Sequence, residues 1–132
     1  MTTEQKRQMI LNAAEDAKAE RINALDLQGK TLIADYFIVC SGNSDVHIRS
    51  IADKIQDALR EEGERALRVE GYREATWVLL DYGDVVVHIM REEARQHYGL
   101  ESFWQNAPLI ESLREHTSDE PRKRAGSEAR RD

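Results

Sequence analysis

Residues 36–59 read YFIVCSGNSDVHIRSIADKIQDAL, which is a strand, a turn and a helix in direct succession. The run from Tyr36 to Cys40 is continuously apolar, as is typical of a central strand covered on both faces. Beyond the turn, apolar residues recur at helical spacing and form one face: Ile48, Ile51, Ala52, Ile55, Ala58 and Leu59. This stretch predicts an α/β fold, in which helices cover a sheet.

The turn between the strand and the helix has two interpretations. Asn43 or Ser44 can cap the helix, Asp45 suits the positive end of its dipole, and Gly42 is expected to supply backbone freedom. Gly42-x-Ser44 also resembles a turn that cradles a phosphate. The further glycines and the lysine of a P-loop are absent, so a helix cap is the favoured interpretation.

The hydrophobic pattern before and after residues 36–59 predicts further helices and strands, which together form one domain over residues 1–112. Thr2 and Gln5 have the spacing of a capping box, and a thin alanine-rich stripe follows them. The expected elements are a helix over 2–23, a strand and turn over 25–32, a strand over 67–69, a hairpin over 76–82 and 85–90, and a helix from 91 to about 106. Residues 113–132 are polar and mixed in charge, which predicts a disordered tail.

The hairpin has two unlike faces. Because side chains alternate along a strand, one face is uniformly apolar and belongs to the core: Val78, Leu80, Tyr82, Val85, Val87 and Ile89. The other face carries Trp77, Asp81 and His88, and tryptophan beside polar groups is typical of a recognition surface. The pattern leaves open whether the last helix covers this face.

Composition restricts the class of function. The chain has 132 residues and a net charge of −6, with about +1 on residues 117–132 and therefore −7 on the rest. An acidic domain is repelled by phosphate backbones, so we expect a basic protein partner and not DNA. No apolar run has the length of a bilayer span or of a signal peptide. With Cys40 as the only cysteine, these features favour the reducing cytoplasm.

Chemistry-bearing residues are sparse. Asp81 and Asp84 flank a tight turn and could hold magnesium for nucleotidyl transfer. Such an enzyme would need further carboxylates close by, but Asp53 and Asp57 share a helix edge with no third acid in register. Aspartate is also favoured in turns for geometric reasons, and that structural interpretation is preferred. The four histidines lack zinc-site spacing, and Cys40 has no catalytic neighbour in sequence. We therefore expect no metal, no cofactor and no catalytic residue.

Three stretches together resemble one family. They are LDLQGKTLIADYFIVCSGNS at 25–44, WVLLDYGDVVVHIM at 77–90 and RQHYGLESFWQNAP at 95–108. In order and spacing they resemble the Iojap or ribosomal silencing factor family, over roughly residues 4–110. The resemblance implies a single α/β domain with a mixed β-sheet flanked by helices, similar to nucleotidyltransferases but without their catalytic residues.

The resemblance also implies a function. Such a protein would bind the large ribosomal subunit through ribosomal protein uL-fourteen, block joining of the small subunit and lower translation when nutrients are scarce. A role in large-subunit biogenesis is a related expectation. A homodimer of the free protein is expected as well, since an exposed hairpin or aromatic patch can pair with itself.

Carried onto this chain, the family pattern predicts a partner-binding set: Trp77, Asp81, His88, Tyr98, Leu100, Glu101 and Trp104. Trp77 and Tyr98 would be the anchors, Asp81 and Glu101 would face basic groups, and His88 would hydrogen-bond across the interface. Core packing in the last helix is the competing interpretation for Leu100 and Trp104. Gly99 departs from the family pattern, which expects Asp there, and leaves the course of the last helix open.

Overall fold

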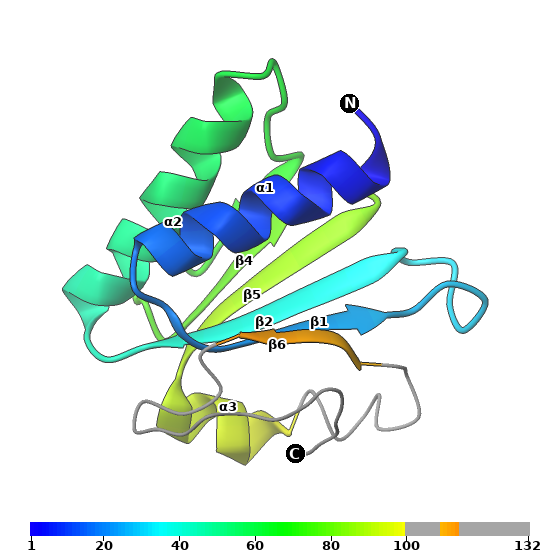
Figure 1. Ribbon diagram of the computed structural model, residues 1–132. Coiled ribbons are helices and arrows are strands. Elements are labelled where there is room, and N and C mark those ends of the chain that lie inside the picture. Colours follow the sequence, from blue (N-terminus) through cyan, green and yellow to red (C-terminus); the bar gives the residue numbers. More distant parts are fainter. Residues whose placement is uncertain (100–108, 114–132) are drawn as a thin grey trace.

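The computed structural model describes residues 1–99 and 109–113 as one mixed sheet with helices on both faces (Figure 1). The elements in chain order are α1 (Thr3–Asp16), β1 (Glu20–Asp26), β2 (Tyr36–Gly42), α2 (Asp45–Arg60), β3 (Arg68–Glu70), β4 (Trp77–Asp81), β5 (Val85–Arg91), α3 (Glu92–Tyr98) and β6 (Leu109–Leu113). The strand order is β3-β4-β5-β2-β1-β6. Among these described strands only β2 and β5 pair in parallel, so the predicted mixed α/β sheet is confirmed.

The sheet separates two apolar clusters. The helices α1 and α2 cover one face and α3 lies on the other (Figure 1). All seven residues of β2 are buried, which confirms the prediction of a central strand. Along β5, Val85, Val87 and Ile89 join the cluster under α1 and α2, whereas Val86 and Met90 join the opposite one. The two predicted faces of the hairpin are therefore correct.

The first helix ends earlier than predicted. Its capping box at Thr2 is present, but α1 stops at Asp16, so the expected extension to Asn23 is wrong. The Lys18 N–H donates to the Glu15 carbonyl and the Ala19 N–H to the Ala14 carbonyl, both at 2.9 Å. This pair of bonds is a Schellman motif, which turns the chain out of the helix and into β1.

Lys18 occupies the left-handed position of this motif, with φ 64°, where glycine is ordinarily preferred. We expect Lys18→Gly to raise the free energy of unfolding by about 1 kcal/mol, because the clash of Cβ with the backbone disappears. Urea denaturation measures this gain. Lys18→Ala is the matched control, since it shortens the side chain but keeps Cβ, and an equal gain in that variant would contradict the backbone explanation.

The second helix begins as predicted, but Gly42 is needed for a different reason. The Ser44 hydroxyl accepts a hydrogen bond from the His47 N–H at 3.0 Å and caps α2. Gly42 has no positive φ. A Cβ there would lie 2.7 Å from Cγ1 of Ile48, so the glycine allows α2 to pack closely on β2 and does not supply unusual backbone freedom.

The C-terminal part holds one element that the pattern did not predict. Strand β6 pairs antiparallel with β1 and ends at Leu113, next to the expected domain boundary. The predicted last helix is observed as α3 up to Tyr98, where Gly99 ends it in the left-handed conformation with φ 60°. The predicted continuation over 100–106 and the tail over 114–132 lie outside the described residues.

Two further predictions concern Cys40 and membranes. Cys40 is fully buried in β2, and burial raises the pKa of its thiol to about 12, so the thiolate needed for nucleophilic chemistry does not form near neutral pH. Within residues 1–99 and 109–113, no helix has both the length and the apolar character needed to cross a membrane.

Candidate functional site

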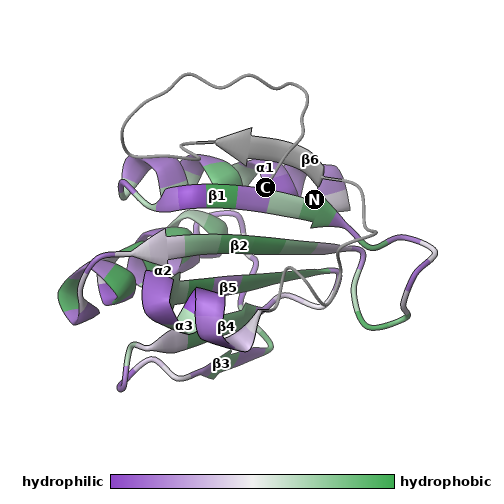
Figure 2. Ribbon diagram, turned by 90° about the horizontal axis from the view of Figure 1, so that it is seen from below, coloured by the Kyte–Doolittle hydropathy of each residue, from purple (hydrophilic) through white to green (hydrophobic). Residues whose placement is uncertain are grey.

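Three aromatic side chains from β4, β5 and α3 meet on the sheet face that carries α3, the face seen in Figure 2. We call Trp77, His88 and Tyr98 the aromatic patch. The ring centroids of Trp77 and Tyr98 are 4.8 Å apart, and those of Trp77 and His88 are 5.8 Å apart. Tyr98 is 57% exposed and Trp77 is partly buried, so these two members of the patch are accessible from the side of α3.

The exposed part of this patch has the composition of a recognition surface. Tyr98 is the last residue of α3, and the turn at Gly99 begins directly after it. Tilted aromatic pairs at this distance stabilise one another, and tyrosine and tryptophan are enriched among the residues that contribute most to binding. The sequence-based anchors Trp77 and Tyr98 are thus brought together in space.

His88 does not lie on the surface of the chain as the partner contact would require. It is 4% exposed, and its Nδ1 accepts a hydrogen bond from Nε1 of Trp77 at 3.0 Å. The edge of the ring packs against Phe37, with centroids 4.8 Å apart. Burial lowers the pKa of His88 to about 4, which keeps the ring neutral at physiological pH.

Asp81 is engaged within the hairpin. Its Oδ1 accepts from the Gly83 N–H at 2.8 Å, the turn geometry that the sequence indicated for aspartate. Its Oδ2 accepts from Nε of Arg68 at 3.3 Å, across the pairing of β3 with β4. A basic group on a partner would therefore compete with Arg68 for this carboxylate.

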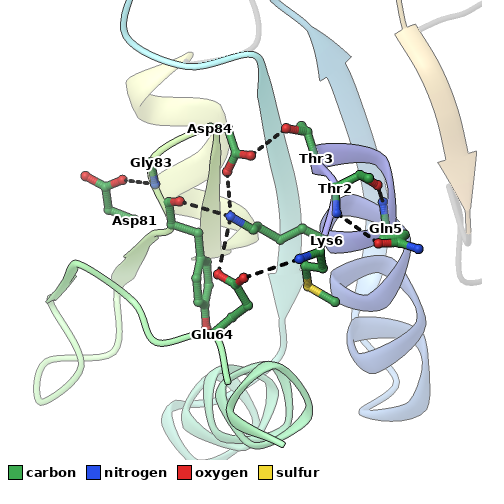
Figure 3. Close-up of polar contacts among 10 residues, drawn as sticks. Thr2, Thr3, Gln5, Lys6, Glu64, Asp81, Gly83 and Asp84 are labelled. Carbon is green, nitrogen blue, oxygen red and sulfur yellow. Dashed lines mark hydrogen bonds and ion pairs between the residues drawn. The ribbon is translucent and has the colours of Figure 1, made fainter. Parts of the chain in front are cut away.

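Asp84 belongs to a different cluster, which ties α1 to the β4–β5 turn (Figure 3). Nζ of the buried Lys6 lies 2.9 Å from Oδ1 of Asp84 and 3.5 Å from Oε1 of Glu64, and the Thr3 hydroxyl donates to Oδ2 of Asp84. Burial favours the neutral acid, but hydrogen bonds from Thr3 and Lys6 and the charge of Lys6 outweigh it and lower the pKa of Asp84.

These contacts give the two hairpin carboxylates separate structural roles. Asp81 holds the turn and Arg68, while Asp84 faces an ammonium group. Over residues 1–99 and 109–113, no group of three His, Cys, Asp or Glu side chains is placed to hold a metal ion. The arrangement thus supports the structural interpretation of both aspartates over the magnesium site.

The Gly42–Ser44 turn uses its polar groups internally. The Asn43 N–H donates to Nδ1 of His47 at 3.0 Å, and Nε2 of that ring lies 2.9 Å from the carbonyl oxygen of Ala17 at the end of α1. With Ser44 capping the helix, the turn joins the two helices, which favours a structural role over phosphate binding.

The remaining predicted site residues, Leu100, Glu101 and Trp104, lie outside the described residues. Sequence reasoning also missed Phe37, a buried residue that packs against His88. The sequence shows which side of β2 the Phe37 side chain shares with its neighbours. Its position beside His88 depends on the parallel register of β2 and β5, in which Val39 pairs with His88.

Comparisons with known proteins agree on one family. A family profile described as "Ribosomal silencing factor during starvation" matches residues 1–132. The ribosomal silencing factor RsfS of Bacillus subtilis is 48% identical over 99 residues, covering 75% of this chain and 84% of the relative. That of Halalkalibacterium halodurans is 42% identical over 111 residues, covering 84% of this chain and 95% of the relative.

A solved structure and a more distant relative extend the comparison. The crystal structure of a Chromobacterium violaceum protein superposes with a TM-score of 0.78 at 33% identity, covering 80% of this chain and 88% of that one. A mouse protein named "Mitochondrial assembly of ribosomal large subunit protein 1" is 26% identical over 99 residues, which cover 73% of this chain and 43% of the mouse protein.

Proposed function

Because the chain belongs to the ribosomal silencing factor family, we propose that it represses translation by binding the large ribosomal subunit through ribosomal protein uL-fourteen. Bound there, it sterically blocks joining of the small subunit and lowers translation under nutrient limitation. Steric blocking requires only that the folded domain stays bound to the large subunit, so no catalytic group is needed. Its site of action is the cytoplasm, where the subunits join.

The observation that carries this proposal is the exposed Tyr98 ring set against Trp77 on a sheet face that α1 and α2 do not cover. Aromatic anchors of this kind contribute most of the free energy in typical interfaces. The net charge of −7 outside residues 117–132 would steer the domain toward a basic ribosomal protein surface. Leu100, Glu101 and Trp104, which follow Tyr98 in the sequence, are proposed as further contacts with the partner.

Two related roles belong to the same proposal. The name of the mouse relative describes assembly of the large ribosomal subunit, which supports a contribution to biogenesis. The same aromatic surface can pair two free copies, and such a homodimer would compete with ribosome binding. Magnesium-dependent nucleotidyl transfer is the weaker alternative, because Lys6 faces Asp84 and the relatives' names describe silencing factors.

Removal of the anchors tests the proposal. We expect Tyr98→Ala and Trp77→Ala each to raise the dissociation constant for the large subunit at least about tenfold, the effect of losing an interface hot spot. Co-sedimentation with purified large subunits in a sucrose gradient measures this. Val46→Ala is the control, because Val46 is 74% exposed and apolar but lies on α2.

Tyr98→Ala is the cleaner of the two variants, since Tyr98 is 57% exposed and is not part of the buried core. Circular dichroism confirms that each variant is folded before binding is compared. If folded Tyr98→Ala and Trp77→Ala sediment with the large subunit as the unsubstituted chain does, the aromatic patch is not the ribosome-binding surface.

A further inference from the structure

Trp77 has one hydrogen-bond donor on its side chain, the indole N–H, and that donor is used inside the chain. Trp77 and His88 lie on neighbouring antiparallel strands and are diagonal neighbours on one face, because Trp77 pairs with Met90 and Leu79 pairs with His88. At this diagonal spacing long side chains can still reach one another. The 3.0 Å bond from Nε1 of Trp77 to Nδ1 of His88 fixes the rotation of the indole.

The geometry also fixes the tautomer of His88. A neutral imidazole that accepts at Nδ1 carries its proton on Nε2. Nε2 is buried and has no hydrogen-bond partner within the part of the chain that the structure describes. A buried donor without a partner destabilises the folded state, whereas an apolar side chain of similar size avoids that cost. The neighbouring positions of β5 on this face are Val86 and Met90, so an apolar residue would suit the environment.

The cost of the unpaired Nε2–H offsets the stability that Nδ1 provides by accepting the indole N–H of Trp77, so net stability gives little reason for a histidine at this position. The ring makes one polar contact in the described structure, with the indole N–H of Trp77, and an edge contact with Phe37. Burial keeps the ring neutral, so its Nδ1 lone pair remains available to Trp77. What the histidine adds over an apolar residue is control of the indole.

We propose that His88 is a positioning residue for partner binding: it holds Trp77 in the rotamer that packs against Tyr98 and does not itself touch the partner. This inference rests on the proposed function and assigns a role to a buried residue beneath that surface. It also defines the chemistry at Trp77. With the N–H engaged, the indole offers its apolar and π surface, which suits an aliphatic or cationic side chain of the partner better than a hydrogen-bond acceptor.

The test compares two replacements of similar size. His88→Asn keeps an oxygen acceptor near the position of Nδ1, whereas His88→Leu removes the acceptor. We expect His88→Leu to raise the dissociation constant for the large subunit about five- to tenfold, because the unheld indole spends less time in the binding rotamer. His88→Asn is expected to recover most of the affinity. The thermal midpoint of His88→Leu at pH 7.5 is expected to stay close to that of the unsubstituted chain, because relief of the unpaired Nε2–H offsets the lost bond to the indole N–H.

A second background separates positioning from direct contact. In Trp77→Phe the ring has no N–H to hold, so adding His88→Leu is expected to cause no further loss of affinity. Hydrogen exchange of the Trp77 indole N–H, followed by NMR in the free chain, is expected to be slow in the unsubstituted protein and in His88→Asn and fast in His88→Leu. The resonance is assigned by its absence in Trp77→Phe.

The outcomes are distinct. Unchanged affinity in His88→Leu, or a loss that persists in the Trp77→Phe background, overturns the positioning role. A lowered thermal midpoint together with weaker binding in both His88 variants marks the residue as merely structural. If the unsubstituted chain does not bind the large subunit, the proposed function fails, and the indole exchange rates still decide whether His88 controls Trp77.

Discussion

Gly71→Ala is expected to lower the free energy of unfolding by about 4 kcal/mol, a large part of the stability of a domain this size. Gly71 has φ +78°, and a Cβ at this position would lie 2.1 Å from the carbonyl oxygen of Trp77. That oxygen is backbone, so the overlap can be relieved only by moving the start of β4. The left-handed conformation adds about 1–2 kcal/mol of strain to the cost of this displacement.

Gly63→Ala is the matched control for this prediction. Gly63 has φ +81°, but a Cβ there would meet nothing within 4 Å, so the substitution isolates the conformational strain at about 1 kcal/mol. Urea denaturation of both variants at one pH gives the comparison. Equal losses in the two would show that the close approach to Trp77 has no energetic consequence. Since the displaced residue is Trp77, weaker ribosome binding should accompany the larger loss.

The second large effect is acid destabilisation through His88. A histidine pKa of about 4 in the folded chain lies below its ordinary value of 6.5, so the unfolded chain binds more protons at intermediate pH. The cost of this difference is small above about pH 6.5, and the fold is progressively destabilised as the pH falls from there toward 4, because only the unfolded chain takes up the proton. The full gap corresponds to about 3 kcal/mol, of which about 2 kcal/mol is expected to appear between pH 7 and pH 5.

His88→Leu should remove this slope, and urea denaturation at pH 7, 6 and 5 measures it. Asp84→Asn is the control, because it removes a group that titrates outside this pH range. The pKa of Asp84 is lowered from 3.8, so its contribution is present above that value and is lost only at more acidic pH. The Asn variant is therefore expected to keep the slope between pH 7 and pH 5. A slope that survives in His88→Leu would assign the acid sensitivity to other groups.

The parts of the fold that were predicted correctly depend on local patterns. The cap at Ser44, the face of α2 and the alternation along β4 and β5 are properties of neighbouring residues, so periodicity reveals them. The end of α1 was missed because Lys18 occupies the left-handed position of the Schellman motif. A glycine at that position would have indicated the end of the helix. Strand β6 was missed because its partner, β1, is distant in sequence.

In the candidate site too, local features could be predicted from the sequence and contacts between distant residues could not. Placing Trp77 and His88 on one face needed only the period of two, and their contact confirms it. The burial of His88 required knowing that β2 brings Phe37 alongside β5 and that Tyr98 packs over Trp77, and these are long-range contacts. The ion pair of Lys6 with Asp84 joins residues 78 positions apart, and no local pattern indicates it.

The buried thiol of Cys40 makes the chain convenient for labelling. Alkylating reagents such as maleimides react with thiolates, and a side chain with no exposed surface and a pKa of about 12 presents almost none at neutral pH. A second cysteine introduced on the outer side of α2 would therefore take up a fluorophore selectively, with the native residue left in place. Binding to ribosomal subunits could then be followed by fluorescence on an otherwise unaltered protein.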